Sequence, residues 1–202
     1  MPICLLVRHG ETDWNRSGRV MGDQPVPINH AGERQARELA SLLHGTKITR
    51  IYSSPVLRAL QTAQILADSL RADIVQTPGL SEIGMGAWMN RFWRDLADDP
   101  AKRDWYSRPD DARPAGGETL RTVQRRAVSA VEGVLSQSEG RHFLLVSHAD
   151  VIRTILAHYL QMDLLQLRNM KIEHASATAL EIGTQSSQLL FLNYRPTPDL
   201  LL

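Results

Sequence analysis

The stretch ICLLVRHG, at residues 3–10, is a continuous apolar run that ends abruptly in Arg-His-Gly. A short run of uninterrupted apolar residues is typical of a strand that is buried on both faces of a parallel sheet. A second stretch of this kind, FLLVSH at residues 143–148, ends in Ser-His. The two stretches therefore predict two inner strands, each followed by a loop that carries a histidine.

Segments with a helical spacing of apolar residues lie between and after these strands. Asn29 can cap a helix that ends near Gly45, and Ser54-Pro55 marks the start of another that continues to Leu70. Further helices are indicated at residues 120–134 and 151–159, and further strands at residues 48–52, 177–182 and 189–194. Strands that alternate with amphipathic helices predict an α/β fold: a three-layer sandwich with a mostly parallel central sheet and helices on both faces.

Residues 86–117 break this alternation. They contain three of the four tryptophans, several arginines, and Pro100, Pro109 and Pro114. We interpret them as an insertion in a single domain that spans residues 1–202, with a helical part at residues 90–97. Because aromatic and arginine side chains are common in ligand sites, we expect the insertion to cover a ligand pocket and to select the substrate.

The charges of the chain nearly cancel, with 23 Lys and Arg against 22 Asp and Glu. A chain without an overall positive field is not expected to bind nucleic acid or an anionic membrane. The single cysteine, Cys4, lies in an apolar run and is expected to be a buried residue without a disulfide or a metal-thiolate role. The first apolar run is too short for a signal peptide, and no later stretch approaches the roughly 20 apolar residues of a membrane span. These features predict a cytoplasmic protein.

Basic side chains and histidines follow the two inner strands. In doubly wound sheets, ligands bind beyond the carboxyl ends of the strands, so His9 and His148 are expected to lie in one crevice. Arg8 leaves the same strand end as His9, and Arg58 lies in the first turn of the helix after Ser54-Pro55. Guanidinium groups form bidentate hydrogen bonds with phosphate oxygens and stay charged when partly desolvated. The four side chains therefore predict a local site for a phosphate group.

Four motifs of the chain resemble those of the histidine phosphatase superfamily, also called the phosphoglycerate mutase-like family. The first is LVRHGET at residues 6–12, which Trp14-Asn15 follows. The others, in family order, are YSSP at residues 52–55 with Arg58-Ala59 and residues 61–63, LSEI at residues 80–83, and VSH at residues 146–148 with residues 151–153. The resemblance spans residues 3 to about 160 and implies the phosphoglycerate mutase-like fold.

The resemblance also implies a role for each matching residue. His9 would be the nucleophile and would become phosphohistidine, and Glu82 would be the proton donor to the leaving group. The phosphoryl oxygens would be held by Arg8, Asn15, Arg58 and His148. The implied reaction needs no metal and no cofactor, because two arginines and a protonated histidine can compensate the charge on the phosphoryl oxygens. The expected substrate is a small phosphorylated metabolite.

The chain departs from the family pattern after Glu82. Many relatives carry Ile-Asp-x-Gly-x-Trp-Glu-Gly, whereas residues 83–90 read IGMGAWMN and lack the two acidic positions. Ala149 replaces a glycine that many relatives carry after the second histidine. These differences leave the contacts to the rest of the substrate open.

Within the family, we favour a phosphatase over a cofactor-dependent phosphoglycerate mutase. The neighbourhood of Glu82 lacks the Asn-Glu-Arg-His-Tyr-Gly pattern typical of such mutases. A mutase also needs basic residues that hold a second phosphate, and the candidates in the insertion are Arg91, Arg94, Lys102, Arg103, Arg108 and Arg113. A charge-rich segment of this kind is more often a solvated surface.

Two other interpretations of the function are less favoured. A non-catalytic module that binds a phosphorylated ligand would need neither a nucleophile nor an acid, and a metallohydrolase would need a clustered ligand pattern. The remaining histidines are expected to be structural or exposed: His30, His44, His142, His158 and His174. The late strands and Leu200–Leu202, in the tail after Arg195, could contribute to a homodimer.

Overall fold

A six-stranded sheet forms the centre of the computed structural model, which describes residues 1–196. Its strand order is β3-β2-β4-β1-β5-β6. The first four strands along the chain are mutually parallel: β1 (Ile3–Arg8), β2 (Arg50–Ser53), β3 (Asp73–Gln76) and β4 (Phe143–Ser147). β5 (Ala177–Ile182) and β6 (Ser187–Tyr194) add an antiparallel edge beside β1. The predicted mostly parallel sheet is confirmed.

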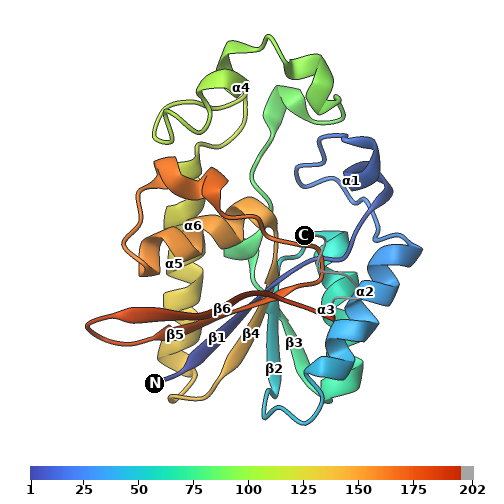
Figure 1. Cartoon of the computed structure of the whole chain (residues 1–202), viewed down its shortest axis with the longest axis vertical. Helices are drawn as coiled ribbons and strands as arrows, with labels where there is room; N and C mark the ends of the chain where they lie inside the picture. Colours follow the sequence, from blue (N-terminus) through green and yellow to red (C-terminus); the bar gives the residue numbers. More distant parts are fainter. Residues whose placement is uncertain (197–202) are drawn as a thin grey trace.

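Helices cover both faces of this sheet, as Figure 1 shows. α2 (His30–Leu42) and α3 (Leu57–Leu70) pack on one face, and α5 (Leu120–Gln137) and α6 (Ala149–Tyr159) pack on the other. Successive side chains of a strand point to opposite faces. Leu5 accordingly joins the core under α2 and α3, whereas Cys4 and Leu6 join the core under α5 and α6. The uninterrupted apolar run of β1 is therefore required by two cores, and the predicted three-layer fold is confirmed.

Three expectations about local structure need correction. β2 begins at Arg50 and not at Ile48, and β3 was not predicted because its four residues, DIVQ, are largely exposed and carry little apolar signal. The helix predicted at residues 90–97 is wrong: only a 3-10 helix, η3 (Trp93–Leu96), forms there. The reason is that Asn90 has a left-handed φ of 72° and residues 90–91 exchange backbone hydrogen bonds with Val20.

Residues 86–117, called the cap segment below, lie beyond the carboxyl ends of the parallel strands in Figure 1. Besides η3 they form η2 (Gly86–Trp88) and α4 (Pro100–Asp104). The cap segment has an aromatic core, because the Trp105 ring packs edge-on against Trp88 at 5.2 Å and stacks on Trp93 at 5.9 Å between ring centroids. The indole of Trp88 also donates a hydrogen bond to Asp99 over 2.9 Å. This core gives a segment without long helices a defined shape.

Three short elements complete the path of the chain: α1 (Asp13–Ser17), η1 (Pro78–Leu80) and η4 (Leu164–Asn169). Within residues 1–196, no helix is both long enough and apolar enough to cross a membrane. The edge strand β6 exposes a row of large apolar side chains, Leu189, Leu190, Phe191, Leu192 and Tyr194. A homodimer through this strand remains a prediction, and Leu200–Leu202 lie outside the described residues.

Candidate active site

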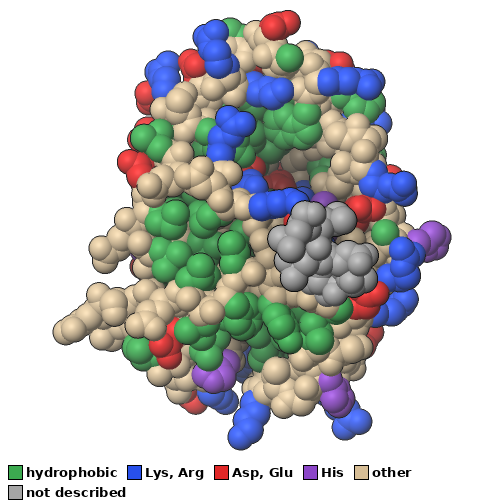
Figure 2. All heavy atoms as spheres, in the orientation of Figure 1, with side chains coloured by type: hydrophobic (Ala, Val, Ile, Leu, Met, Phe, Trp, Pro, Cys, Tyr) green, Lys and Arg blue, Asp and Glu red, His purple; other side chains and the backbone are tan. Residues whose placement is uncertain are grey.

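The two predicted histidines meet at the carboxyl edge of the sheet. His9 follows β1 and His148 follows β4, and these strands are parallel neighbours in which Arg8 lies opposite Ser147. The ring centroids of His9 and His148 are 5.2 Å apart, and both side chains are buried. Figure 2 shows a hollow between the cap segment and the sheet with basic, acidic and histidine side chains at its floor. The expected convergence of residues 139 positions apart is therefore present.

Hydrogen bonds on both sides of the His9 ring determine its tautomer. Nδ1 lies 2.8 Å from the carbonyl oxygen of Gly10, which can only accept, so Nδ1 carries the proton. On the other side, Nε of Arg58 donates to Nε2 of His9 over 3.2 Å, so Nε2 carries the lone pair. Burial, and then the charge of Arg58, holds the pKa of His9 well below its ordinary value. His9 is therefore a neutral imidazole with its lone pair on Nε2 at neutral pH.

Arg58 is fully buried beside this nitrogen. Its Nη2 donates to the Gly22 carbonyl over 2.8 Å, and its Nη1 donates to the Gln24 carbonyl over 3.3 Å. The helix α3 places it, because Arg58 is the second residue of that helix. These contacts anchor a guanidinium that stays charged at neutral pH next to the lone pair of His9.

Ser54 holds the second histidine. The sequence suggested that Ser54-Pro55 starts the helix, but α3 starts at Leu57 and has no side-chain cap. The Ser54 hydroxyl instead lies 2.8 Å from Nε2 of His148 and accepts a hydrogen bond from the backbone of Val56. Desolvation, followed by the charges of Arg58 and Arg8, lowers the pKa of His148 well below its ordinary value. His148 is therefore neutral at neutral pH, which corrects the expectation of a protonated histidine at this position. The turn that precedes α3 holds its ring in a fixed orientation.

Glu82 faces both histidine-bearing strand ends from the loop after η1. Its Oε2 lies 3.4 Å from Nη2 of Arg58 and 3.4 Å from Nδ1 of His148. Its side chain is 13% exposed, and its other oxygen accepts a hydrogen bond from its neighbour Ile83. Burial raises the pKa of Glu82 above its ordinary value, and this effect outweighs the attraction of Arg58. Glu82 can therefore hold a proton at a higher pH than an exposed glutamate.

An arginine from α5 fixes the loop that carries Glu82. Arg126 donates to the carbonyl oxygens of Gly79, Ser81 and Glu82 at 2.7–3.1 Å. Its other partner is Glu118, at 2.8 Å, which in turn accepts a hydrogen bond from the backbone of Gly84. This pair could not be predicted from the sequence, because nothing local in the helix indicates which loop its arginines will meet. Arg126 and Glu118 together clamp the backbone on both sides of Glu82.

The two other residues predicted to bind phosphate, Arg8 and Asn15, form hydrogen bonds outside the cluster of His9, Arg58, Glu82 and His148. Arg8 donates from Nη1 to the carbonyl of Ile172 over 2.6 Å, and burial lowers its pKa to about 10, so it stays charged at neutral pH. Asn15 forms a capping box with Thr12 at the start of α1, in which its side-chain oxygen accepts from the Thr12 backbone over 3.1 Å. The side-chain hydrogen bonds of Asn15 within residues 1–196 all join it to Thr12 and none joins it to His9 or His148. Its role in holding phosphate remains a prediction.

Three buried nitrogens around His9 have no hydrogen-bond partner among residues 1–196: Nε of Arg8, Nδ1 of His148 and Nε2 of His174. The ring of His174, one of the histidines expected to be structural or exposed, lies 5.9 Å from the ring of His9. A buried polar atom without a partner costs roughly 1–3 kcal/mol, and such costs are concentrated at functional sites. The arrangement of unsatisfied nitrogens and buried arginines suits an anion with several oxygen atoms.

Nearly the whole chain matches a known family. The model of the histidine phosphatase superfamily (branch 1) matches residues 4–195. The chain belongs to the histidine phosphatase superfamily. It is therefore an enzyme of a superfamily that contains phosphatases and mutases.

Individual members of the superfamily resemble the chain over most of its length. A protein of Enterobacter sp. (strain 638), named probable phosphoglycerate mutase GpmB, is 32% identical over 178 residues, which cover 87% of this chain and 83% of the relative. The structure of Bacillus stearothermophilus YhfR superposes with a TM-score of 0.88 at 30% identity and covers 94% of this chain and 96% of its own. A mutant of the phosphoserine phosphatase from Entamoeba histolytica, in complex with phosphoserine, has a TM-score of 0.87 at 26% identity, with coverages of 96% and 97%.

In this member of the histidine phosphatase superfamily, one group of side chains has the spacing of metal ligands. His9, Glu82 and His148 each offer a ligand atom, and these atoms lie within 4.8 Å of one another. However, Nε of Arg58 lies 3.2 Å from Nε2 of His9, and the guanidinium also contacts Glu82. A divalent cation at this point would face a fixed positive charge at close range, whereas an anion would be attracted. The spacing of the three ligand atoms therefore fits a metal ion, but the neighbouring positive charge of Arg58 disfavours one.

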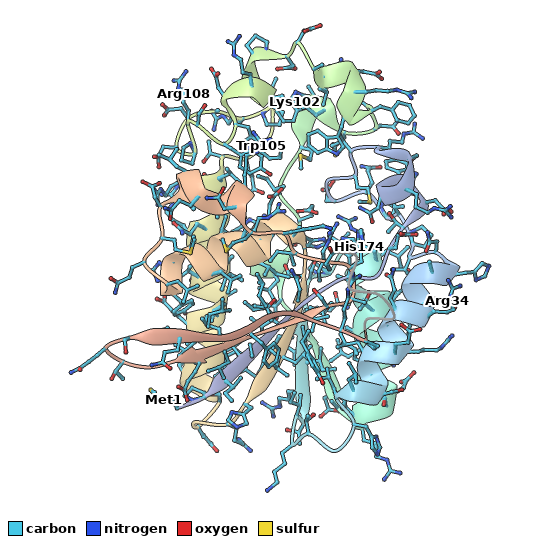
Figure 3. All side chains as sticks on the ribbon, in the orientation of Figure 1. Met1, Arg34, Lys102, Trp105, Arg108 and His174 are labelled. Atoms are coloured by element: carbon cyan, nitrogen blue, oxygen red, sulfur yellow. The ribbon has the colours of Figure 1, made fainter. Side chains whose placement is uncertain are left out.

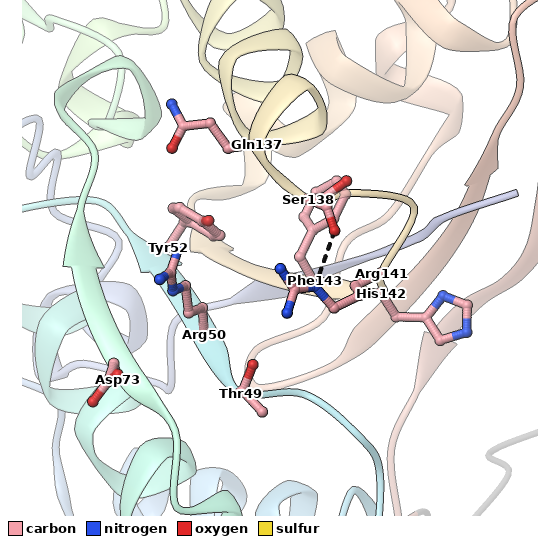
Figure 4. A pocket seen from close by; sticks show the side chains of 9 residues that line it. All are labelled: Thr49, Arg50, Tyr52, Asp73, Gln137, Ser138, Arg141, His142 and Phe143. Atoms are coloured by element: carbon pink, nitrogen blue, oxygen red, sulfur yellow. Dashed lines mark hydrogen bonds between the residues drawn. The ribbon is translucent and has the colours of Figure 1, made fainter.

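A second hollow, of about 210 Å³, lies at the opposite edge of the sheet and is shown in Figure 4. It is lined by residues at the amino ends of the strands and by the end of α5, among them Arg50, Asp73, Arg141 and His142. Arg141 bonds within its own turn, to the Ser138 carbonyl and to Glu139. This hollow lacks the buried, converging charges of the carboxyl edge, so the candidate active site is the hollow under the cap segment.

Proposed function

We propose that the protein is a phosphomonoester hydrolase that acts through a phosphohistidine at His9 on a small phosphorylated metabolite. The observation that carries this proposal is the state of His9, whose lone pair is fixed on Nε2 between a carbonyl on one side and Arg58 on the other. When substrate binds, the Arg58 N–H turns from Nε2 to a phosphoryl oxygen, and the released lone pair of this buried neutral imidazole is a nucleophile near neutral pH.

In the first half-reaction, Nε2 of His9 attacks phosphorus and the bond from phosphorus to the ester oxygen breaks. Arg8, Asn15, Arg58 and His148 hold the phosphoryl oxygens, and protonated Glu82 gives its proton to the leaving alkoxide. The position of Glu82, 3.4 Å from both Arg58 and His148, supports this role because it lies beside the groups that bind the phosphoryl oxygens. The products of this step are an alcohol and phosphohistidine with an ionised Glu82.

In the second half-reaction, water attacks the phosphorus atom of the phosphohistidine. Glu82 accepts the proton of this water, the bond from phosphorus to Nε2 breaks, and inorganic phosphate leaves. His9 returns to its neutral form with the proton on Nδ1. The same carboxylate thus acts as acid and then as base, and no metal or cofactor takes part.

Metal independence is part of this proposal, since Arg58 occupies the space beside His9 and Glu82 where a cation would be held. Treatment with EDTA is expected to leave the rate of phosphomonoester hydrolysis unchanged. Loss of activity that Zn²⁺ or Mn²⁺ restores would assign His9, Glu82 and His148 to a metal site instead.

A cofactor-dependent phosphoglycerate mutase is the second candidate, supported by the names of curated relatives such as GpmB. The contacts within the cap segment favour the phosphatase over the mutase. Most of its candidate phosphate-binding cations contact other parts of the cap: Arg94, Arg103 and Arg108 pair with aspartates, and Lys102 and Arg91 donate to backbone carbonyls. These charges are already partnered, which weakens the case for a second phosphate site under the cap.

The test is a turnover screen against a panel of phosphomonoesters, including phosphoserine and 3-phosphoglycerate, with and without 2,3-bisphosphoglycerate. A phosphatase releases inorganic phosphate without the bisphosphate. A mutase interconverts phosphoglycerates only when the bisphosphate is present. A binding module turns over nothing and forms no acid-labile phosphohistidine, which would refute the proposal. Cap variants that leave the substrate profile unchanged would count against substrate selection by the cap segment.

A further inference from the structure

A third imidazole lies beside His9. His174 belongs to the loop between η4 and β5, and its ring centroid is 5.9 Å from that of His9, with an angle of 53° between the ring planes. Figure 3 labels His174 at the edge of the sheet that faces the cap segment. Nε2 of His174 is buried and has no hydrogen-bond partner within residues 1–196. The roles proposed above for the family motifs leave this nitrogen unused.

The backbone holds the His174 and His9 side chains together. The amide of Ala175 donates to the carbonyl of Arg8 over 3.0 Å and to that of His9 over 3.3 Å, and the amide of Arg8 donates to Ser176. Ala175 has a left-handed φ of 44°, a conformation that costs energy for a residue with a side chain. The loop that carries His174 is therefore an extension of the β1 and β5 pairing, and its turn is maintained against local strain.

A residue on β6 gives this loop a second support. The side-chain oxygen of Asn193 accepts from the amide of Glu173 over 2.8 Å and from the hydroxyl of Ser176 over 3.1 Å. Its side-chain nitrogen donates to the carbonyl of Lys171. The backbone is thus bonded on both sides of His174, which fixes the point of the loop from which the imidazole projects.

The charge state of His174 fits a hydrogen-bond donor of fixed position. Burial, followed by the charges of Arg8, Arg195 and Lys171, lowers the pKa of His174 to about 3. At neutral pH the ring is therefore uncharged and carries one proton. The surrounding cations favour a negatively charged ligand, and an oxygen of such a ligand would satisfy the buried nitrogen.

We propose that His174 is a substrate-binding residue whose Nε2–H donates a hydrogen bond to a non-bridging oxygen of the phosphoryl group that His9 attacks. The inference rests on the proposed function and adds to it a contact that the family motifs do not supply. It predicts a contribution to phosphate affinity that is the same for every phosphomonoester, because the bonded oxygen belongs to the phosphoryl group and not to the leaving group.

The experiment compares His174→Phe, which keeps a ring without a donor, with His174→Asn, which keeps a donor. Binding of inorganic phosphate is measured by isothermal titration, and KM is measured for several phosphomonoesters. We expect His174→Phe to weaken phosphate binding and to raise every KM about tenfold, the effect of one lost hydrogen bond to a charged group, and His174→Asn to lose less. The exposed His158, changed to Asn, serves as the control.

Unchanged phosphate binding in folded His174→Phe would overturn the inference, and so would a KM increase confined to one leaving group. If the Phe variant does not fold, His174→Ala is measured in the same way against the same criteria. The titration also separates the two proposals. A wild-type protein that binds phosphate but hydrolyses no ester would refute the proposed function, while the His174 variants would still report on the contact.

Discussion

The two edges of the sheet carry similar residue types and differ in what surrounds them. At the amino edge, Arg50, Arg141 and His142 are exposed. At the carboxyl edge, His9, Arg58 and His148 are buried, and Glu82 lies among them. Side-chain composition alone therefore does not make a site. Burial changes the protonation behaviour of each group and strengthens the charges that remain.

The largest effect is expected when the histidine at each edge of the sheet is replaced by alanine. His9→Ala should lower kcat for a phosphomonoester by at least about 10³-fold, because no other group can take the phosphoryl group. His142→Ala is the control: His142 also accepts a hydrogen bond, from the backbone of Ile3 over 3.0 Å, but at the exposed edge. The measurement is the steady-state rate of hydrolysis, and circular dichroism checks that each variant is folded. If His9→Ala keeps most of the activity, the contrast between the edges has no catalytic meaning.

The arginines of the two edges give the next prediction. Arg58→Lys keeps the positive charge but removes the rigid guanidinium that reaches His9, Gly22 and Glu82. We expect a loss of about 10²-fold in kcat/KM, as for other fixed donors that stabilise a transition state. Arg50→Lys, at the start of β2, should change the rate little. Equal behaviour of the two variants would contradict the assigned position of the phosphoryl group.

Glu82 should reveal its role through the leaving group and the pH. Glu82→Gln is expected to slow hydrolysis of alkyl phosphates by about 10²-fold and to affect p-nitrophenyl phosphate far less, because that leaving group needs little protonation. Because the pKa of Glu82 is raised, wild-type activity should fall as the pH rises and this acid loses its proton. Because the pKa of His9 is lowered, the nucleophile should stay unprotonated and active at acidic pH. In the Gln variant the alkaline decline should disappear. Equal losses with both esters would argue against a proton donor.

The arginine pair on α5 allows a matched test of positioning. Arg126 bonds to the loop of Glu82, whereas its neighbour Arg125 is exposed. Arg126→Met should lower the rate with alkyl phosphates about tenfold through a displaced Glu82 and leave p-nitrophenyl phosphate less affected. Arg125→Met should match the wild type. A loss of the same size on both esters would indicate a general loss of structure instead.

The smallest effect concerns stability. Because the pKa of buried His148 is lowered in the folded state, the unfolded chain takes up a proton below the ordinary value of 6.5 and the folded protein does not. This contribution destabilises the folded protein as the pH falls from 7 to 5. Denaturant unfolding should give the wild type a slope up to about 1.4 kcal/mol per pH unit steeper than His148→Asn. An identical slope in the wild type and in His148→Asn would contradict the buried neutral state of His148.

Local sequence patterns determined the class of the fold and most of the candidate site. The apolar runs of β1 and β4 need two cores, so they indicate inner strands before any partner is known. The motifs that contain His9, Arg58, Glu82 and His148 imply a phosphoryl-transfer site by their resemblance to a family. By contrast, the exposed strand β3 and the irregular start of the cap segment carry no clear periodicity, so they could not be predicted.

Which distant groups meet depends on the packing of the whole domain. The Arg126 clamp on Glu82, the contact of Ser54 with His148 and the approach of His174 to His9 join residues 44, 94 and 165 positions apart. The physical reason is that burial and hydrogen bonding depend on how strands are ordered in the sheet and how helices pack on it. Sequence spacing records the local period of an element, whereas the electrostatic environment of a side chain is set by neighbours from other elements.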